Sequence, residues 1–87
     1  MPEPEAARRA LLERCPTGSD REVVRKFIAA NFTKVREQRE GGITCVINEQ
    51  FVPLVGHIWM EVSFTFDQAG RLRDITVEKR SLLGYTA

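Results

Sequence analysis

The chain has 87 residues and a mass of 9.9 kDa, the size of one domain with one modest hydrophobic core. Hydrophobic residues make up 43% and charged residues 29%, which is typical of a globular domain and not of a disordered or membrane-spanning chain. Thirteen basic and twelve acidic side chains leave a net charge of +1. This balance argues against binding to nucleic acid or to an acidic membrane surface. We therefore expect neither a nucleic-acid partner nor a membrane span.

The N-terminus and the cysteines each leave two alternatives open. The segment Met1-Pro2-Glu3-Pro4-Glu5 is acidic and has no hydrophobic secretory region. The chain is then either a cytoplasmic protein or a mature segment whose leader was removed, which would belong in the periplasm or cell envelope. Cys15 and Cys45 are either two buried, reduced thiols or, in an oxidising compartment, one disulfide. Their separation is not a metal-ligand spacing and His57 is the single histidine, so we expect no metal site and no cofactor.

Two helices are predicted in the first third of the chain. The first spans Pro4 to Arg14, because proline suits the first turn and alanine and leucine favour helix. The second spans Asp20 to about Ala30, with Ser19 and Glu22 at capping-box spacing. Its apolar residues recur at the helical spacing of four, as in the pair Val24 and Ile28.

The rest of the chain is predicted to form strands. A charged segment from Lys34 to Glu40 leads to Gly41-Gly42, and an alternating strand follows from Ile43 to Ile47. An apolar loop is expected from Phe51 to Gly56. The segment from Ile58 to Asp67 shows the clearest alternation, and its turn, Asp67-Gln68-Ala69-Gly70, leads into a last strand from Arg71 to about Arg80. Because Leu72 is out of phase with Ile75 and Val77, we expect a bulge between Leu72 and Ile75.

These elements predict a single α+β domain over residues 1–87. Two N-terminal helices would pack on one face of a three- to four-stranded antiparallel sheet, in the order ααβββ. The opposite face, with Glu61, Ser63 and Thr65, should be hydrated. Residues 1–4 and 82–87 are candidates for flexible ends. For the apolar tail from Leu82 to Tyr85, docking on the sheet or helices is the alternative.

Two stretches resemble a known family. Pro16-Thr17-Gly18-Ser19-Asp20-Arg21-Glu22-Val23 and Phe64-Thr65-Phe66-Asp67-Gln68-Ala69-Gly70-Arg71-Leu72 resemble, in order and spacing, the helix start and the final hairpin of the SmpA/OmlA (BamE)-like domain of bacterial envelope proteins. That domain shares its architecture with half of the β-lactamase inhibitory protein. The resemblance covers Leu11 to Lys79 and implies a non-catalytic protein-binding module. The chain departs from the family in having no lipobox, and the matched residues imply structural roles only.

The segment from Phe51 to Trp59 is the candidate partner-binding surface. Trp59 points away from the inward set of its strand by parity, and it joins four apolar residues of the preceding loop: Phe51, Val52, Leu54 and Val55. An exposed apolar patch with a tryptophan is typical of a protein-binding surface. The alternative is that the loop folds over Trp59 as part of the structure.

Other functions have less support in the sequence. No nucleophile, base and acid can be assembled from the chain, so we predict that it is not an enzyme. The alternative function is binding of a small ligand in a pocket near Trp59 and His57. A free strand edge would also allow a homodimer.

Overall fold

The computed structural model describes residues 3–54 and 56–82. Helix α1 spans Pro4–Arg14 and helix α2 spans Arg21–Asn31. Four strands follow, β1 (Lys34–Glu37), β2 (Ile43–Val52), β3 (Gly56–Phe66) and β4 (Leu72–Leu82), and they pair in the order β1-β2-β3-β4. All three pairings are antiparallel. The predicted α+β class with helices before strands is therefore confirmed.

One hydrophobic cluster joins residues of the sheet to residues of the helical segment. The ladder places Cys45 opposite Val62 and Val62 opposite Val77, so these side chains share one face, the core face. They cluster with buried residues of α2 and of the α1–α2 loop, and Leu11 and Leu12 of α1 pack against the cluster. The buried members are Cys15, Val24, Ile28, Ile43, Cys45, Val62, Phe64, Leu72 and Ile75.

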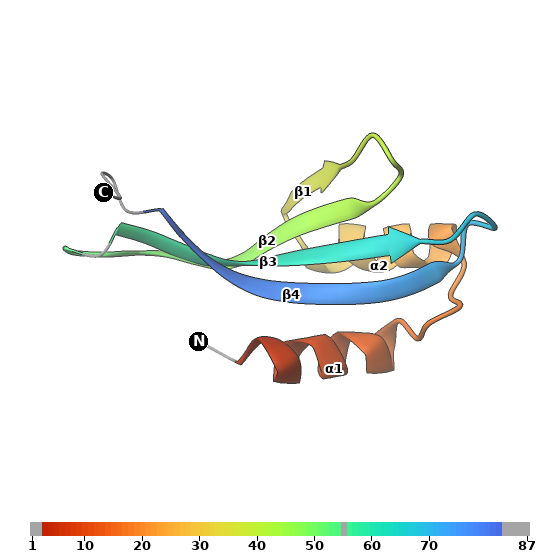
Figure 1. Ribbon diagram of the computed structural model, residues 1–87, viewed down its shortest axis with the longest axis horizontal. Coiled ribbons are helices and arrows are strands. Elements are labelled where there is room, and N and C mark those ends of the chain that lie inside the picture. Colours follow the sequence, from red (N-terminus) through yellow and green to blue (C-terminus); the bar gives the residue numbers. More distant parts are fainter. Residues whose placement is uncertain (1–2, 55, 83–87) are drawn as a thin grey trace.

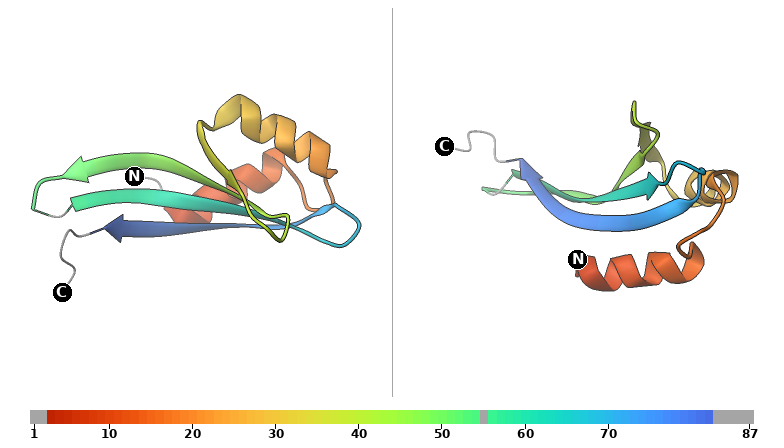
Figure 2. Two further views of the ribbon diagram at one scale, coloured as in Figure 1. Left: turned by 90° about the horizontal axis from the view of Figure 1, so that it is seen from above. Right: turned by 45° about the vertical axis from the view of Figure 1, so that its right-hand side comes forward.

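The sheet extends beyond both helices. The molecule measures 44 × 26 × 21 Å, and Figure 1 shows the β2–β3 hairpin extending well past the N-terminal end of α1. The turn between β1 and β2 rises on the side of the sheet opposite α1, as Figure 1 and the right view of Figure 2 show. The molecule thus has a core at one end, a projecting hairpin at the other, and a curled turn above the open face, which carries Thr44, Ser63 and Thr65.

Helix α2 begins one residue later than the capping-box prediction requires. Asp20, and not Ser19, is the N-cap, and its carboxylate accepts from the Glu22 N–H at 3.1 Å. Ser19 instead donates through its hydroxyl to the Pro16 carbonyl at 2.6 Å. The reason is tertiary: the Ser19 carbonyl accepts from the Leu72 N–H, and this contact holds Ser19 against β4.

The predicted loop from Phe51 to Gly56 is also wrong at both ends. Strand β2 continues to Val52 and β3 already begins at Gly56. The register shifts between Ile47 and Gln50, where Asn48 has φ 54°. Because this bulge interrupts the alternation of apolar and polar residues, the sequence pattern does not predict the second half of β2. Pro53, which has no N–H to donate, follows the last residue of β2.

The last hairpin agrees closely with its prediction. The Asp67 carboxylate accepts from the N–H groups of Ala69 and Arg71 at 2.9 Å each, and Gly70 has φ 80°. The register shifts between Thr65 and Phe66, so that Arg73 is the extra residue between the paired Leu72 and Asp74. This confirms the predicted bulge, and it lets both Leu72 and Ile75 reach the core.

Pro4 is the first residue of α1 and Leu82 is the last of β4, whereas residues 1–2 and 83–87, with most of the apolar tail, lie outside the described residues. Within residues 3–54 and 56–82, neither helix has the length and apolar character that a membrane crossing requires.

Candidate functional site

The β2–β3 hairpin ends in an apolar tip that projects from the core. Phe51 is 62% exposed and Leu54 is 98% exposed. Phe51 pairs with His57 in the ladder, and their rings meet edge to face with centroids 5.2 Å apart. Because side chains alternate along a strand, Trp59 lies on the same face as His57. We call Phe51, Leu54, His57 and Trp59 the tip surface.

The sequence-predicted binding residues are only partly brought together. Phe51 and Trp59 share a face, but Val52 pairs with Gly56 on the opposite face of the hairpin and is partly buried. Trp59 is itself partly buried and stands opposite Arg80 of β4. Val55 lies outside the described residues. The exposed apolar area of the tip surface therefore comes mainly from Phe51 and Leu54.

Leu54 has an unusual backbone as well as an exposed side chain. Its φ is 70°, in the left-handed region where a side chain with a Cβ costs about 1–2 kcal/mol. A leucine that is nearly fully exposed gains no burial to offset that cost. Strained positions of this kind concentrate where a side chain serves a function other than stability.

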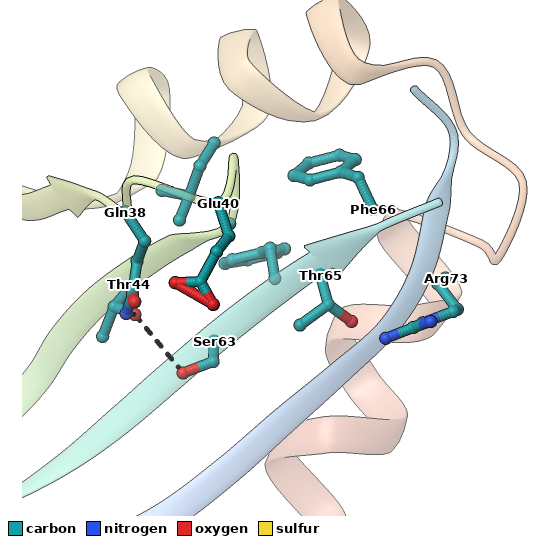
Figure 3. A pocket seen from close by; sticks show the side chains of 10 residues that line it. Gln38, Glu40, Thr44, Ser63, Thr65, Phe66 and Arg73 are labelled. Atoms are coloured by element: carbon teal, nitrogen blue, oxygen red, sulfur yellow. Dashed lines mark hydrogen bonds between the residues drawn. The ribbon is translucent and has the colours of Figure 1, made fainter. Parts of the chain in front are cut away.

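A second feature lies at the other end of the open face. Beneath the β1–β2 turn is a cavity of about 300 Å³, which we call the polar pocket. In Figure 3, Ser63 and Thr65 of β3 form its floor, with Glu40 reaching down from the turn and Arg73 reaching in from β4. The Gln38 amide donates to the Thr44 hydroxyl at 2.6 Å, and the Thr44 and Ser63 oxygens are 3.4 Å apart.

Sequence reasoning did not find the polar pocket. The sequence patterns assign no binding role to Glu40 or Arg73, and they place Ser63 and Thr65 on a hydrated face. Two signals were present: the hydroxyl residues alternate along β3, and the bulge predicted beside Arg73 changes which face that residue occupies. The position of Glu40 above these residues depends on how the β1–β2 turn curls over the sheet, and no local sequence pattern predicts that.

Three further cavities have volumes of about 270–340 Å³ and are lined mainly by residues of α2, β1 and β2. None of the four cavities described is lined by His57 or Trp59. The sequence-based alternative of a ligand pocket at those two residues thus gains no support from these cavities.

Both cysteines are free thiols buried in the core. Cys15 is 1% exposed and Cys45 is 0% exposed. Burial raises the pKa of the Cys45 thiol to about 11, and burial raises the Cys15 pKa too, against a smaller opposing effect of Arg14. A raised pKa leaves little thiolate, the form that reacts as a nucleophile or metal ligand.

The two edges of the sheet differ in how they are closed. On β4, the Arg8 Nε donates to the Ile75 carbonyl at 2.8 Å, and the Ile75 N–H donates to the Asp74 carboxylate at 2.8 Å. Because outward-facing groups recur at every second residue, Val77 and Lys79 also face outward, and within residues 3–54 and 56–82 they have no hydrogen-bond partner beyond the edge. Near the opposite edge, Lys34 of β1 pairs with Glu49 of the neighbouring strand β2, and this pairing lowers the pKa of the Glu49 carboxyl.

Comparisons with protein-family models, with curated proteins and with solved structures found no match to this chain.

Proposed function

We propose that this protein is a non-catalytic interaction module that binds another protein through the tip surface. The observation that carries the proposal is Leu54, which is 98% exposed at φ 70°. A side chain this exposed buries almost no surface in the fold, and a positive φ is unfavourable for a leucine. A protruding apolar residue of this kind is suited to enter a pocket on a partner.

The surrounding geometry supports binding by insertion. Phe51 adds an aromatic side chain that is 62% exposed, and its ring is oriented by the edge-to-face contact with His57. Aromatic side chains lose little conformational entropy on binding and are enriched at interface hot spots. A narrow hairpin fits a concave partner surface better than a flat one. The resemblance to the SmpA/OmlA (BamE)-like domain also favours a binding role.

The open face adds to the proposal. We propose that the two helices together cover the core face, which leaves the opposite face and the hairpin for partners. We further propose that the outward groups of Val77 and Lys79 pair with the same strand of a second copy, giving a homodimer through the β4 edge. The Arg8–Ile75 hydrogen bond would limit that pairing to the second half of the strand.

Affinity capture from an extract of the source organism tests the main proposal. The immobilised protein is compared with the double variant Phe51→Ser/Leu54→Ser and with Val23→Ser, a matched control because Val23 is 57% exposed on α2, away from the tip. A partner retained by the wild type and by Val23→Ser, absent with the double variant, and then bound again as a purified protein would support the proposal. A partner that binds all three forms equally would contradict it.

A further inference from the structure

We propose that the polar pocket binds a small zwitterion, a molecule that carries one ammonium and one carboxylate group, as a free amino acid or a dipeptide does. This site is separate from the tip surface and does not depend on it. Its cavity of about 300 Å³ falls at the lower end of the volumes typical of small-molecule sites. Three observations support the inference: two opposite charges line the cavity, features of the backbone position them, and side-chain hydroxyl groups lie between them.

The two charges are Glu40 and Arg73, which line the same cavity. Figure 3 shows the Glu40 carboxylate and the Arg73 guanidinium on different sides of the floor, both extending over it. Within residues 3–54 and 56–82, neither group takes part in an ion pair, whereas Arg8, Arg25 and Arg80 all do. The pocket therefore presents one acceptor for a cation and one bidentate donor for an anion.

Arg73 reaches the pocket only because of the β-bulge. Strict alternation would place Arg73 on the same face as Ile75, toward the core, because the two residues are two positions apart. The register shift between Thr65 and Phe66 leaves Arg73 as the extra residue opposite that step and turns it toward the open face. Bulges often re-aim a side chain beside a binding site in this way.

Glu40 is held above the floor by an anchored turn. The Arg21 guanidinium donates to the Gly41 carbonyl at 2.6 Å, and it also stacks over the Phe66 ring at 4.8 Å. Gly41 has φ 94°, and a Cβ at Gly42 would come within 3.3 Å of the Phe64 carbonyl oxygen. The two glycines thus permit a turn that approaches β3 closely, and Arg21 fixes it there. A fixed wall reduces the entropy that a ligand must remove on binding.

The floor supplies neutral hydrogen-bonding groups between the charges. Thr44, Ser63 and Thr65 all line the cavity. The Thr44 hydroxyl accepts from Gln38, and the Thr65 hydroxyl donates to the Asp74 carbonyl at 3.3 Å. The Ser63 and Thr65 oxygens retain acceptor capacity beyond these contacts and the Thr44–Ser63 contact. Such groups suit the ammonium hydrogens or the amide of a small zwitterion, and Phe66 adds an apolar wall to the same cavity.

The test is an NMR titration of the whole protein with glycine and with glycylglycine, which offer two separations between the charges. We expect saturable shifts of the backbone amides of Ser63, Thr65 and Arg73. N-acetylglycine keeps only the anion and glycinamide keeps only the cation, and each should bind at least about tenfold more weakly than the better zwitterion. Absence of saturable shifts with both zwitterions up to about 10 mM would overturn the proposal, as would glycinamide or N-acetylglycine binding equally well.

Two variants assign the binding to the named charges. Glu40→Gln and Arg73→Gln should each weaken binding of the better zwitterion at least about tenfold. Arg39→Gln, in the same turn but outside the pocket lining, and Glu78→Gln on β4 are the matched controls and should leave binding unchanged. Equal binding by all four variants would overturn the proposal. So would a double-mutant cycle of unfolding that couples Glu40 and Arg73 in the absence of ligand, because the two groups would then neutralise each other.

Discussion

Arg8 on α1 and Asp74 on β4 form an ion pair at 2.8 Å, and the same guanidinium donates to the backbone carbonyl of the next residue of the strand. Together these contacts tie the first helix to the free edge of the sheet. They also close one outward-facing position of β4, at Ile75, against pairing with another strand. The helix contact and the dimer that we propose at this edge would thus be linked through one side chain.

Removing this ion pair should lower the unfolding free energy of the protein. It should also make that free energy less dependent on pH in acid. The hydrogen bond from Arg8, helped by the Ile75 N–H, lowers the pKa of Asp74. A carboxylate with a lowered folded-state pKa stabilises the fold above the unfolded value near 3.9, and this contribution is lost as the pH falls through the folded-state pKa. Because Asp74 is 41% exposed, we expect Arg8→Ala to cost about 0.5–1 kcal/mol at neutral pH.

Urea unfolding at neutral pH and at about pH 3 measures this effect. The difference in unfolding free energy between Arg8→Ala and the wild type should shrink at the acid pH. Arg9→Ala, on the next residue of α1, is the control and should change little at either pH. An Arg8→Ala penalty that is independent of pH would show that Asp74 is not the partner that matters.

A single proline substitution can test the proposed association through the β4 edge without disrupting the fold. Lys79→Pro removes an outward N–H, whereas Arg80→Pro removes an N–H that faces β3, because the two directions alternate along β4. Sedimentation equilibrium should show a concentration-dependent dimer for the wild type and a folded monomer for Lys79→Pro. Arg80→Pro should lower the stability of the monomer itself. A Lys79→Pro protein that dimerises as the wild type does would place the contact elsewhere.

Cys45 should make the protein less stable in alkali. Burial raises its pKa to about 11 from an ordinary value of 9.0. Well below pH 9 the thiol is protonated in the folded and in the unfolded protein. Between pH 9 and about pH 11 it ionises mainly in the unfolded protein, so the unfolding free energy falls as the pH rises. The loss should reach about 2 kcal/mol by about pH 10.5. Cys45→Ala should show a correspondingly smaller alkaline loss in urea unfolding, and an equal loss would exclude Cys45 as its source.

The replacement Leu54→Gly tests whether Leu54 stabilises the hairpin. Glycine adopts φ 70° without the Cβ strain of about 1–2 kcal/mol, although it adds roughly 0.5–1 kcal/mol of unfolded-state entropy. Since the lost side chain is 98% exposed, we expect an unfolding free energy equal to or above that of the wild type. Thermal unfolding provides the measurement, and destabilisation by more than about 1 kcal/mol would show that Leu54 packs in the fold.

Local patterns predicted the parts of the fold that local forces determine. Three elements could be predicted without contacts from distant parts of the chain. They are the alanine-rich first helix that begins at Pro4, the Asp67 turn with Gly70, and the alternating strand around Val62. The bulge at Arg73 was also visible, since Leu72 and Ile75 cannot otherwise both be buried on one face.

The misses share a different cause, which is a contact between distant segments. Ser19 loses the N-cap to Asp20 because its backbone bonds to Leu72. The second half of β2 was hidden because Asn48 shifts the register at a bulge that only the pairing with β3 defines. The polar pocket was missed for the same reason, because Glu40 meets the floor only after Arg21 has anchored its turn.

The central claim, that the tip surface binds a partner and does not support the fold, is tested most directly by one comparison. The Phe51→Ser/Leu54→Ser double variant is measured for urea unfolding and for binding of the captured partner. The account predicts an unfolding free energy within about 1.5 kcal/mol of the wild type, the most that loss of the Phe51–His57 contact should cost, and at least a tenfold loss of affinity. Unchanged affinity, or a loss of cooperative unfolding, would contradict it.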